Sequence, residues 1–103
     1  MSTKNEAAIK VIVELQAKPG RRAALMTLLE SVVAEYGPDQ PGFLGSTRYA
    51  VLDNPDIVVE IADWESAGVR AEAMQRVLAS GAYAALEELL AAPLRPTVIK
   101  ELP

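Results

Sequence analysis

The sequence predicts an α+β fold in which strands and helices follow the order βαββαβ. Two observations predict it: stretches of alternating apolar and polar residues are typical of strands, and apolar stripes spaced by three or four residues are typical of helices. A third observation, the length of 103 residues, predicts a single domain that spans 1–103. Residues 1–8 lack either pattern and predict a flexible N-terminus.

The first strand is predicted over residues 9–17, where every odd position is apolar and the even positions are mostly polar. Lys18-Pro19-Gly20 ends this strand, because proline lacks a backbone donor and glycine permits a tight turn. The first helix is predicted over residues 21–36. Its apolar stripe consists of Leu25, Leu28, Leu29, Val32 and Tyr36.

A hairpin is predicted from strands over residues 43–52 and 57–64, with Asp53-Asn54-Pro55-Asp56 as its turn. Ser66 is the expected N-cap of a second helical segment, which is interrupted near Ser80-Gly81. The last strand is expected within residues 97–102. This order predicts a ferredoxin-like antiparallel sheet with the helices on one face.

Both faces of the predicted sheet are rich in apolar residues, although the helices cover only one of them. On the hairpin, one face carries Leu44, Ala50, Leu52, Ile57, Val59 and Ile61, and the other carries Phe43, Val51, Val58, Ala62 and Trp64. An apolar face without helices needs another cover. A second copy of the chain would supply it, so the sequence predicts a homodimer.

The composition excludes several classes of function. The chain contains no cysteine and no histidine, which excludes a disulfide framework, a zinc finger, a Ser-His-Asp triad and a His-ligated metal site. The formal net charge of −4 argues against nucleic acid or an anionic membrane as a partner. No apolar run is long enough to span a bilayer, and residues 1–6 do not resemble a signal peptide, which together predict a cytoplasmic protein.

Glu60 is the candidate catalytic residue, because it interrupts the most β-prone stretch of the chain. Burial of a carboxylate without a partner is unfavourable, and a desolvated Glu60 would have a raised pKa and could act as a base toward a phenol. The structural alternative is a glutamate paired with Arg48, with Arg70 or with a neighbouring subunit.

The register of the hairpin decides which side chains accompany Glu60. If Leu52 pairs with Ile57 across the turn, one face carries a small-molecule pocket with a few polar groups. The residues of this predicted pocket are Tyr49, Glu60, Trp64, Thr47 and Gly45. A register shifted by one residue would instead place Arg48 opposite Glu60 and dissolve this group, although Glu60 and Trp64 would still share a face.

Several short runs form a pattern that covers the chain from about Ile9 to Leu102. The runs are Lys18-Pro19-Gly20, Pro41-Gly42-Phe43-Leu44-Gly45, Asp53-Asn54-Pro55, Trp64-Glu65-Ser66, and Ser80 with Tyr83, Leu89-Leu90 and Pro93. This pattern closely resembles the antibiotic biosynthesis monooxygenase family of dimeric α+β barrels. The resemblance independently implies a βαββαβ domain that forms a homodimer.

The resemblance also places individual residues. Trp64 matches the family's tryptophan at the end of the third strand. Glu60 falls where quinone-forming members resemble one another in having Asn, and Arg70 falls where such enzymes can have Tyr. Val77 stands where many members have His, and Val13 stands near an Asn of the haem-degrading members. Without that Asn and His, the resemblance does not imply haem degradation.

The activity implied by the resemblance is oxidation of an electron-rich phenol, anthrone or quinol to a quinone by O₂, without a metal or another cofactor. The expected catalytic residues are Glu60 and Trp64. The expected substrate-binding residues are Tyr49, Phe43, Gly45, Thr47, Arg70, Val77 and Tyr83. Plain packing is the alternative role for Trp64 and Tyr83, and exposure to solvent is the alternative for Arg70.

Two other functions fit the same fold. A non-catalytic protein could hold a small hydrophobic ligand, and an isomerase or cyclase would need a base but no oxygen. A second βαββαβ module, the RNA-recognition domain, is disfavoured by the acidic balance of the chain and by the lack of stacking aromatic residues on its first and third strands.

Overall fold

The computed structural model describes residues 7–36 and 40–103. Residues 1–6, which belong to the segment expected to be flexible, lie outside the described residues. The elements are β1 (Ile9–Gln16), α1 (Arg22–Tyr36), β2 (Phe43–Val51), β3 (Asn54–Trp64), α2 (Ala67–Ser80), α3 (Ala82–Leu89) and β4 (Arg95–Ile99). The predicted α+β class and element order are therefore confirmed.

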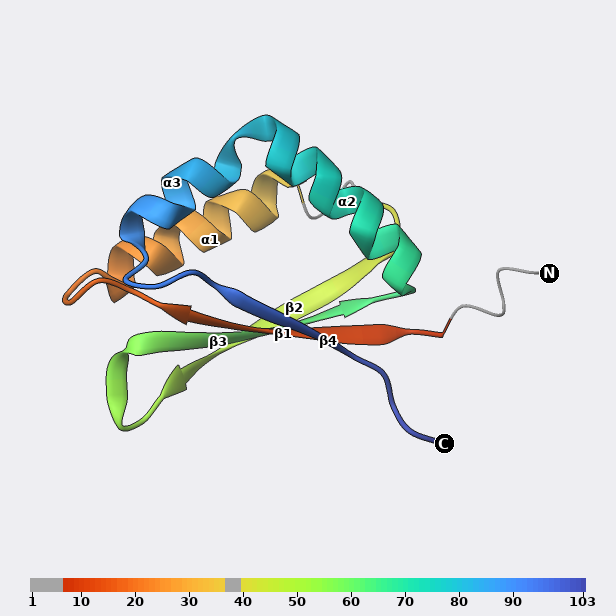
Figure 1. Cartoon of the computed structure of the whole chain (residues 1–103), viewed down its shortest axis with the longest axis horizontal. Coiled ribbons are helices and arrows are strands. Elements are labelled where there is room, and N and C mark those ends of the chain that lie inside the picture. Colours follow the sequence, from red (N-terminus) through yellow and green to blue (C-terminus); the bar gives the residue numbers. More distant parts are fainter. Residues whose placement is uncertain (1–6, 37–39) are drawn as a thin grey trace.

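The four strands form one antiparallel sheet in the order β2-β3-β1-β4. The helices α1, α2 and α3 all lie on one face of this sheet, and no helix in the described part of the chain covers the other (Figure 1). The interruption predicted near Ser80-Gly81 divides the second helical segment into α2 and α3, where Gly81 adopts a left-handed φ of 84°. Ser66 caps α2 as predicted, because its hydroxyl oxygen accepts a hydrogen bond from the Val69 N–H at 3.2 Å.

The core lies between the sheet and the helices. Odd-numbered residues of β1 and even-numbered residues of β3 point toward the helices, because neighbouring strands keep their side-chain alternation in register. Leu25 of α1 is fully buried against this layer. Two groups of buried side chains result. In one, Leu15 and Val58 of the sheet pack with Leu86 of α3. In the other, Val11, Ala62 and Trp64 of the sheet pack with Ala73 of α2.

The register predicted for the hairpin is wrong by one residue. The turn consists of Leu52 and Asp53, and β3 already begins at Asn54, opposite Val51. The Asn54 side-chain oxygen accepts a hydrogen bond from the Asp56 N–H at 3.1 Å, so the Asn-Pro-Asp run organises the start of a strand and not a loop. Farther along the hairpin, Arg48 is the partner of Glu60.

This register moves three predicted pocket residues to the other face of the sheet. Gly45, Thr47 and Tyr49 pair with Asp63, Ile61 and Val59, whose side chains point away from the helices. A one-residue shift reverses the face of every side chain on a strand, which explains the error. A second irregularity lies between Phe43 and Gly45, and it returns the Phe43 side chain to the side of Trp64.

Gly42 lies where the start of β2 meets the first turn of α2, and this contact yields a prediction. It has a φ of 82°, and a Cβ atom there would overlap the Val69 side chain. Substitution Gly42→Ala is expected to lower the free energy of unfolding by about 2–3 kcal/mol, since backbone strain and overpacking act together. Urea denaturation followed by circular dichroism measures this loss.

The matched control is Gly20→Ala. Gly20 has a similar φ of 75°, but nothing lies within 4 Å of its Cβ position. Only the backbone strain should remain there, about 1 kcal/mol. Equal losses in the two variants would contradict a steric role for Val69.

Candidate functional site

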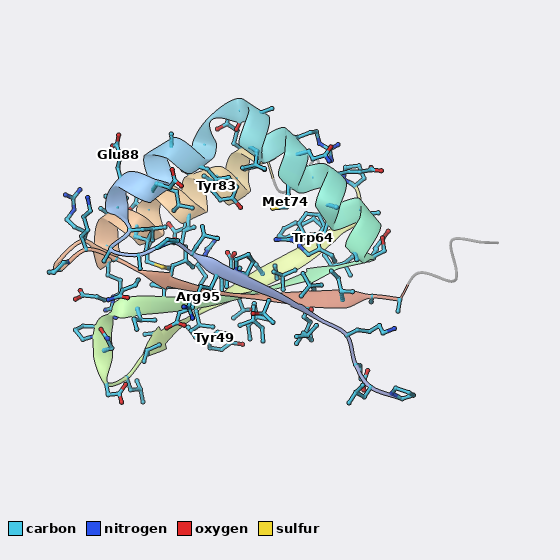
Figure 2. All side chains as sticks on the ribbon, viewed as in Figure 1. Tyr49, Trp64, Met74, Tyr83, Glu88 and Arg95 are labelled. Atoms are coloured by element: carbon cyan, nitrogen blue, oxygen red, sulfur yellow. The ribbon has the colours of Figure 1, made fainter. Side chains whose placement is uncertain are left out.

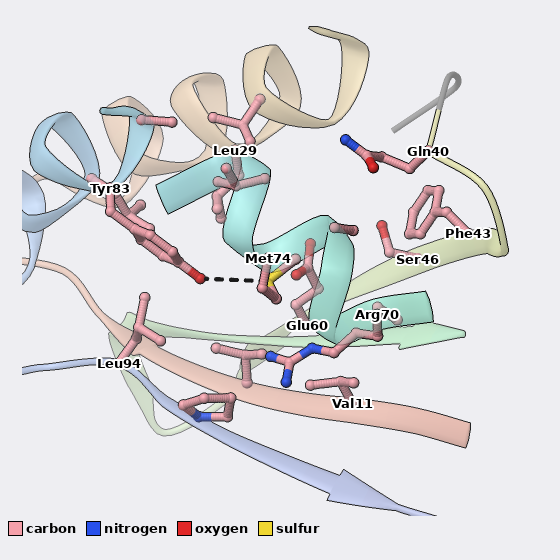
Figure 3. A pocket seen from close by; sticks show the side chains of 18 of the residues that line it. Val11, Leu29, Gln40, Phe43, Ser46, Glu60, Arg70, Met74, Tyr83 and Leu94 are labelled. Carbon is pink, nitrogen blue, oxygen red and sulfur yellow. Dashed lines mark hydrogen bonds between the residues drawn. The ribbon is translucent and has the colours of Figure 1, made fainter. Parts of the chain in front are cut away.

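A cavity of about 150 Å³ lies between the sheet and the helices (Figure 3). Strands β1, β2 and β3 form its floor, and residues of α1, α2 and α3 form its walls. Most of its lining is aliphatic or aromatic. The polar and charged lining residues are Gln40, Ser46, Glu60, Arg70 and Tyr83. An apolar cavity with a few convergent polar groups is the usual form of a small-molecule site.

The cavity brings together two thirds of the predicted site residues. Those that line it are Glu60, Trp64, Phe43, Arg70, Val77 and Tyr83. Tyr49, Gly45 and Thr47 do not line it, because the observed register places them on the opposite face of the sheet. Figure 2 shows Tyr49 on the far side of the sheet from Trp64, Met74 and Tyr83. Half of the Tyr49 surface is exposed.

Glu60 lies in the middle of β3, between Val13 of β1 and Arg48 of β2. The Arg48 Nε donates a hydrogen bond to the Glu60 Oε2 at 3.1 Å, and the Arg48 Nη2 donates to the Leu29 carbonyl oxygen at 3.4 Å. The two side chains are only 15% and 17% exposed. Of the alternatives left open by the sequence, the observed one is therefore the pair with Arg48.

This pair leaves part of Glu60 available for chemistry. Oε1 of Glu60 accepts no hydrogen bond from the described residues, whereas Oε2 faces Arg48. The contact with the guanidinium is a charge-assisted hydrogen bond, and it involves only one of the two carboxylate oxygens. Glu60 can thus act as a base at the cavity floor while its charge is balanced from outside the cavity.

Trp64 and Phe43 form an aromatic wall at one end of the cavity. Their ring centroids are 5.1 Å apart with an interplanar angle of 61°, an edge-to-face arrangement that is favourable for aromatic pairs. Trp64 is 5% exposed and packs in the core with Val11, Ala62 and Ala73. Its packing role and its place in the cavity wall therefore occur together.

The helix side of the cavity is formed by one face of α2 and by the start of α3. Arg70, Ala73, Met74 and Val77 recur at intervals of three and four residues, which places them on a single face of α2. The Tyr83 hydroxyl contacts the Met74 sulfur at 3.8 Å (Figure 3). The helical spacing in the sequence could have predicted Met74 as a lining residue.

Ser46 is another lining residue that sequence reasoning missed. It pairs with Ala62 and lies on the cavity floor, where the predicted register would place its neighbours Gly45 and Thr47. No signal in the sequence identifies it without the hairpin register. Among residues 7–36 and 40–103, no three Asp or Glu side chains are grouped to hold a metal ion, and no helix is long and apolar enough to cross a membrane.

Comparison with known proteins gives a family match. Residues 8–89 match the family model described as antibiotic biosynthesis monooxygenase. No curated protein sequence matches the chain.

Several solved structures share the fold. A conserved protein from Methanosarcina mazei superposes with a TM-score of 0.82 at 20% sequence identity, covering 99% of this chain and 100% of the other. SnoaB, a cofactor-independent oxygenase from Streptomyces nogalater, gives 0.80 at 18% identity, covering 94% and 95%. A Mycobacterium tuberculosis protein gives 0.79 at 23% identity, covering 94% and 97%. At these identities the likeness establishes the fold alone.

Proposed function

The chain belongs to the antibiotic biosynthesis monooxygenase family, and we propose that it is a cofactor-independent oxygenase that converts an electron-rich phenol or quinol into a quinone. The observation that carries this proposal is the arrangement of Glu60 and Trp64 around one apolar cavity, with Oε1 of Glu60 free of hydrogen bonds from the described residues. The similar fold of SnoaB, which is itself described as a cofactor-independent oxygenase, adds support.

In the proposed reaction, Glu60 removes the phenolic proton and the aromatic wall holds the ring. The phenolate is more electron-rich than the phenol and reduces O₂ directly. A phenol with a free para C–H and one O₂ give a quinone and one water: one oxygen atom becomes the second carbonyl oxygen of the quinone, and the other leaves as water. A quinol with a free ring C–H gives a hydroxyquinone and one water in the same way. The phenol loses four electrons and O₂ gains them. The protein contributes positioning, exclusion of water and a proton acceptor.

The test is oxygen uptake by purified, chelator-treated protein with a panel of phenols, naphthols and anthrones. Uptake above the spontaneous rate, with formation of the quinone, is the expected result. No enzyme-dependent uptake with any member of the panel would contradict the proposal. An oxygen electrode and product chromatography supply the two readouts.

A non-catalytic protein that retains a hydrophobic ligand is the second candidate. The ion pair between Glu60 and Arg48 favours it, because a structural role already accounts for the carboxylate. Thermal stabilisation of the protein by a ligand that is recovered unchanged would distinguish this candidate from the oxygenase. Recovery of an isomer without oxygen uptake would instead indicate an isomerase or cyclase.

We also propose that the open face of the sheet mediates a homodimer. Its centre is apolar, with Ile12, Val59 and Ile61 on adjacent strands. Toward one end of the sheet, Lys10 pairs with Asp63 across strands β1 and β3, and this contact raises the pKa of Lys10 through a hydrogen bond to and the charge of Asp63. An apolar centre with a charged edge is typical of an interface.

The dimer yields a prediction on oligomeric state. Ile61→Glu is expected to convert the dimer into a monomer, because each protomer would place a charge at the centre of the apolar face. Leu78→Glu is the matched control, since Leu78 is 60% exposed on α2, in the helix layer. Light scattering coupled to size-exclusion chromatography measures the mass. A wild-type monomer, or a dimer that survives Ile61→Glu, would contradict this interface.

A further inference from the structure

Arg70 is a cation in the lining of an otherwise mainly apolar cavity. It lies in the first turn of α2, and its side chain extends over β1 beside Val11 (Figure 3). Within the described ranges, its guanidinium makes no ion pair and no hydrogen bond, since the only ion pairs there are Lys10–Asp63 and Arg48–Glu60. A partly buried cation in apolar surroundings is stabilised by an anion.

The charge of Glu60 does not balance Arg70. No atom of the Glu60 carboxylate lies within ion-pair distance of Arg70, and its Oε2 is bound to Arg48. Arg48 itself does not line the cavity. The charges of Glu60 and Arg48 therefore cancel each other. Among the described residues, the positive charge of Arg70 in the cavity lining has no negative charge to balance it.

The volume of the cavity limits the size of the ligand that can bind beside Arg70. Its volume is about 150 Å³. A cavity of about 150 Å³ accommodates a benzene ring, whereas drug-sized ligands occupy about 300–1,000 Å³. A single aromatic ring fits within this space, whereas a three-ring anthrone would extend beyond it.

We infer that the ligand of this cavity is a one-ring phenol that carries a carboxylate, with the carboxylate bound by Arg70 and the ring held between Glu60 and the wall formed by Trp64 and Phe43. A guanidinium binds a carboxylate through two parallel hydrogen bonds, which fixes the orientation of the ring as well as its charge. This inference rests on the proposed function for the role of the phenol, but the binding step can be measured separately.

The experiment compares 3-hydroxybenzoate with 3-hydroxybenzamide by isothermal titration calorimetry under anaerobic conditions. The two probes have nearly the same shape and differ in charge. Wild-type protein is expected to bind the benzoate about 10–100-fold more tightly, in the range of a charge-assisted hydrogen-bonded pair. Arg70→Gln is expected to reduce this preference to about one without changing the affinity for the benzamide, and Arg70→Lys is expected to restore part of it.

Arg21→Gln is the matched control, because it removes the same charge from an exposed position before α1. The preference should persist in this variant. Equal affinity of the wild type for the two probes, a preference that survives Arg70→Gln, or no binding of either probe would overturn the inference. Circular dichroism of each variant confirms that it is folded.

The two proposals fail in different ways. A charge preference that depends on Arg70, without oxygen uptake with any phenol, would retain the carboxylate site and reject the oxygenase. Oxygen uptake with an uncharged three-ring anthrone, without binding of the benzoate, would retain the oxygenase and reject the carboxylate site.

Discussion

Replacing Glu60 by glutamine is expected to lower the initial rate of enzyme-dependent oxygen uptake by about 100-fold or more, the range of a lost general base. The amide keeps the size of the side chain and can still accept a hydrogen bond from the Arg48 Nε, which lies 3.1 Å from Oε2. It cannot take a proton from the phenol. The loss should therefore appear in the rate constant and not in the affinity for the substrate.

Separate measurement of kcat, KM and stability distinguishes catalysis from a structural role. If Glu60 is the base, Glu60→Gln lowers kcat and leaves KM and the melting temperature unchanged. A variant that only loosened the fold would instead lower the melting temperature. Glu65→Gln is the matched control, since Glu65 is exposed next to Trp64 and should retain the full rate.

An unchanged rate in Glu60→Gln would remove Glu60 from the mechanism. The ion pair with Arg48 would then be its whole role. Arg48→Met tests this structural role directly, because it leaves the Glu60 carboxylate at the cavity floor without its counter-ion. A stability loss without a change in kcat would assign the pair to the fold.

The order of elements in this chain was predictable from periodicity, because each period reports which side of an element is buried. The odd positions of β1 and the stripe of α1 that contains Leu25 and Leu29 both face the core as expected. Ser66 and Gly81 were also identifiable, since a cap hydroxyl and a left-handed residue are local requirements of a helix end. These features were predictable because each depends only on residues that are close together in the sequence.

The register of the hairpin was not predictable in the same way. Asn54, Pro55 and Asp56 have the composition of a turn, yet the chain turns at Leu52 and Asp53. Both faces of the hairpin are apolar, so hydrophobic pattern alone could not distinguish two registers that differ by one residue. The cavity is therefore lined by the predicted residues of β3 and the helices and by Phe43, whereas Gly45, Thr47 and Tyr49 of β2 lie on the other face of the sheet.

Trp64→Ala is expected to lower the free energy of unfolding by about 3–5 kcal/mol, as for other buried aromatic residues. Trp64 is 5% exposed and makes the edge-to-face contact with Phe43. Such a loss is a large share of the roughly 5–15 kcal/mol that stabilises a typical domain. Trp64→Phe retains a ring and should lose less, while weakening the binding of an aromatic ligand.

Urea denaturation at one fixed protein concentration measures these losses, since the proposed dimer would make stability depend on concentration. Trp64 is the single tryptophan of the chain, so its variants have no tryptophan fluorescence. Unfolding is therefore followed by circular dichroism. Leu52→Ala is the control, because Leu52 is 99% exposed at the hairpin turn and its truncation should change stability by less than about 0.5 kcal/mol. A loss below about 1 kcal/mol in Trp64→Ala would mean that the indole is only a wall of the cavity and not a part of the core, because the packing of Val11, Ala62 and Ala73 would then stand without it.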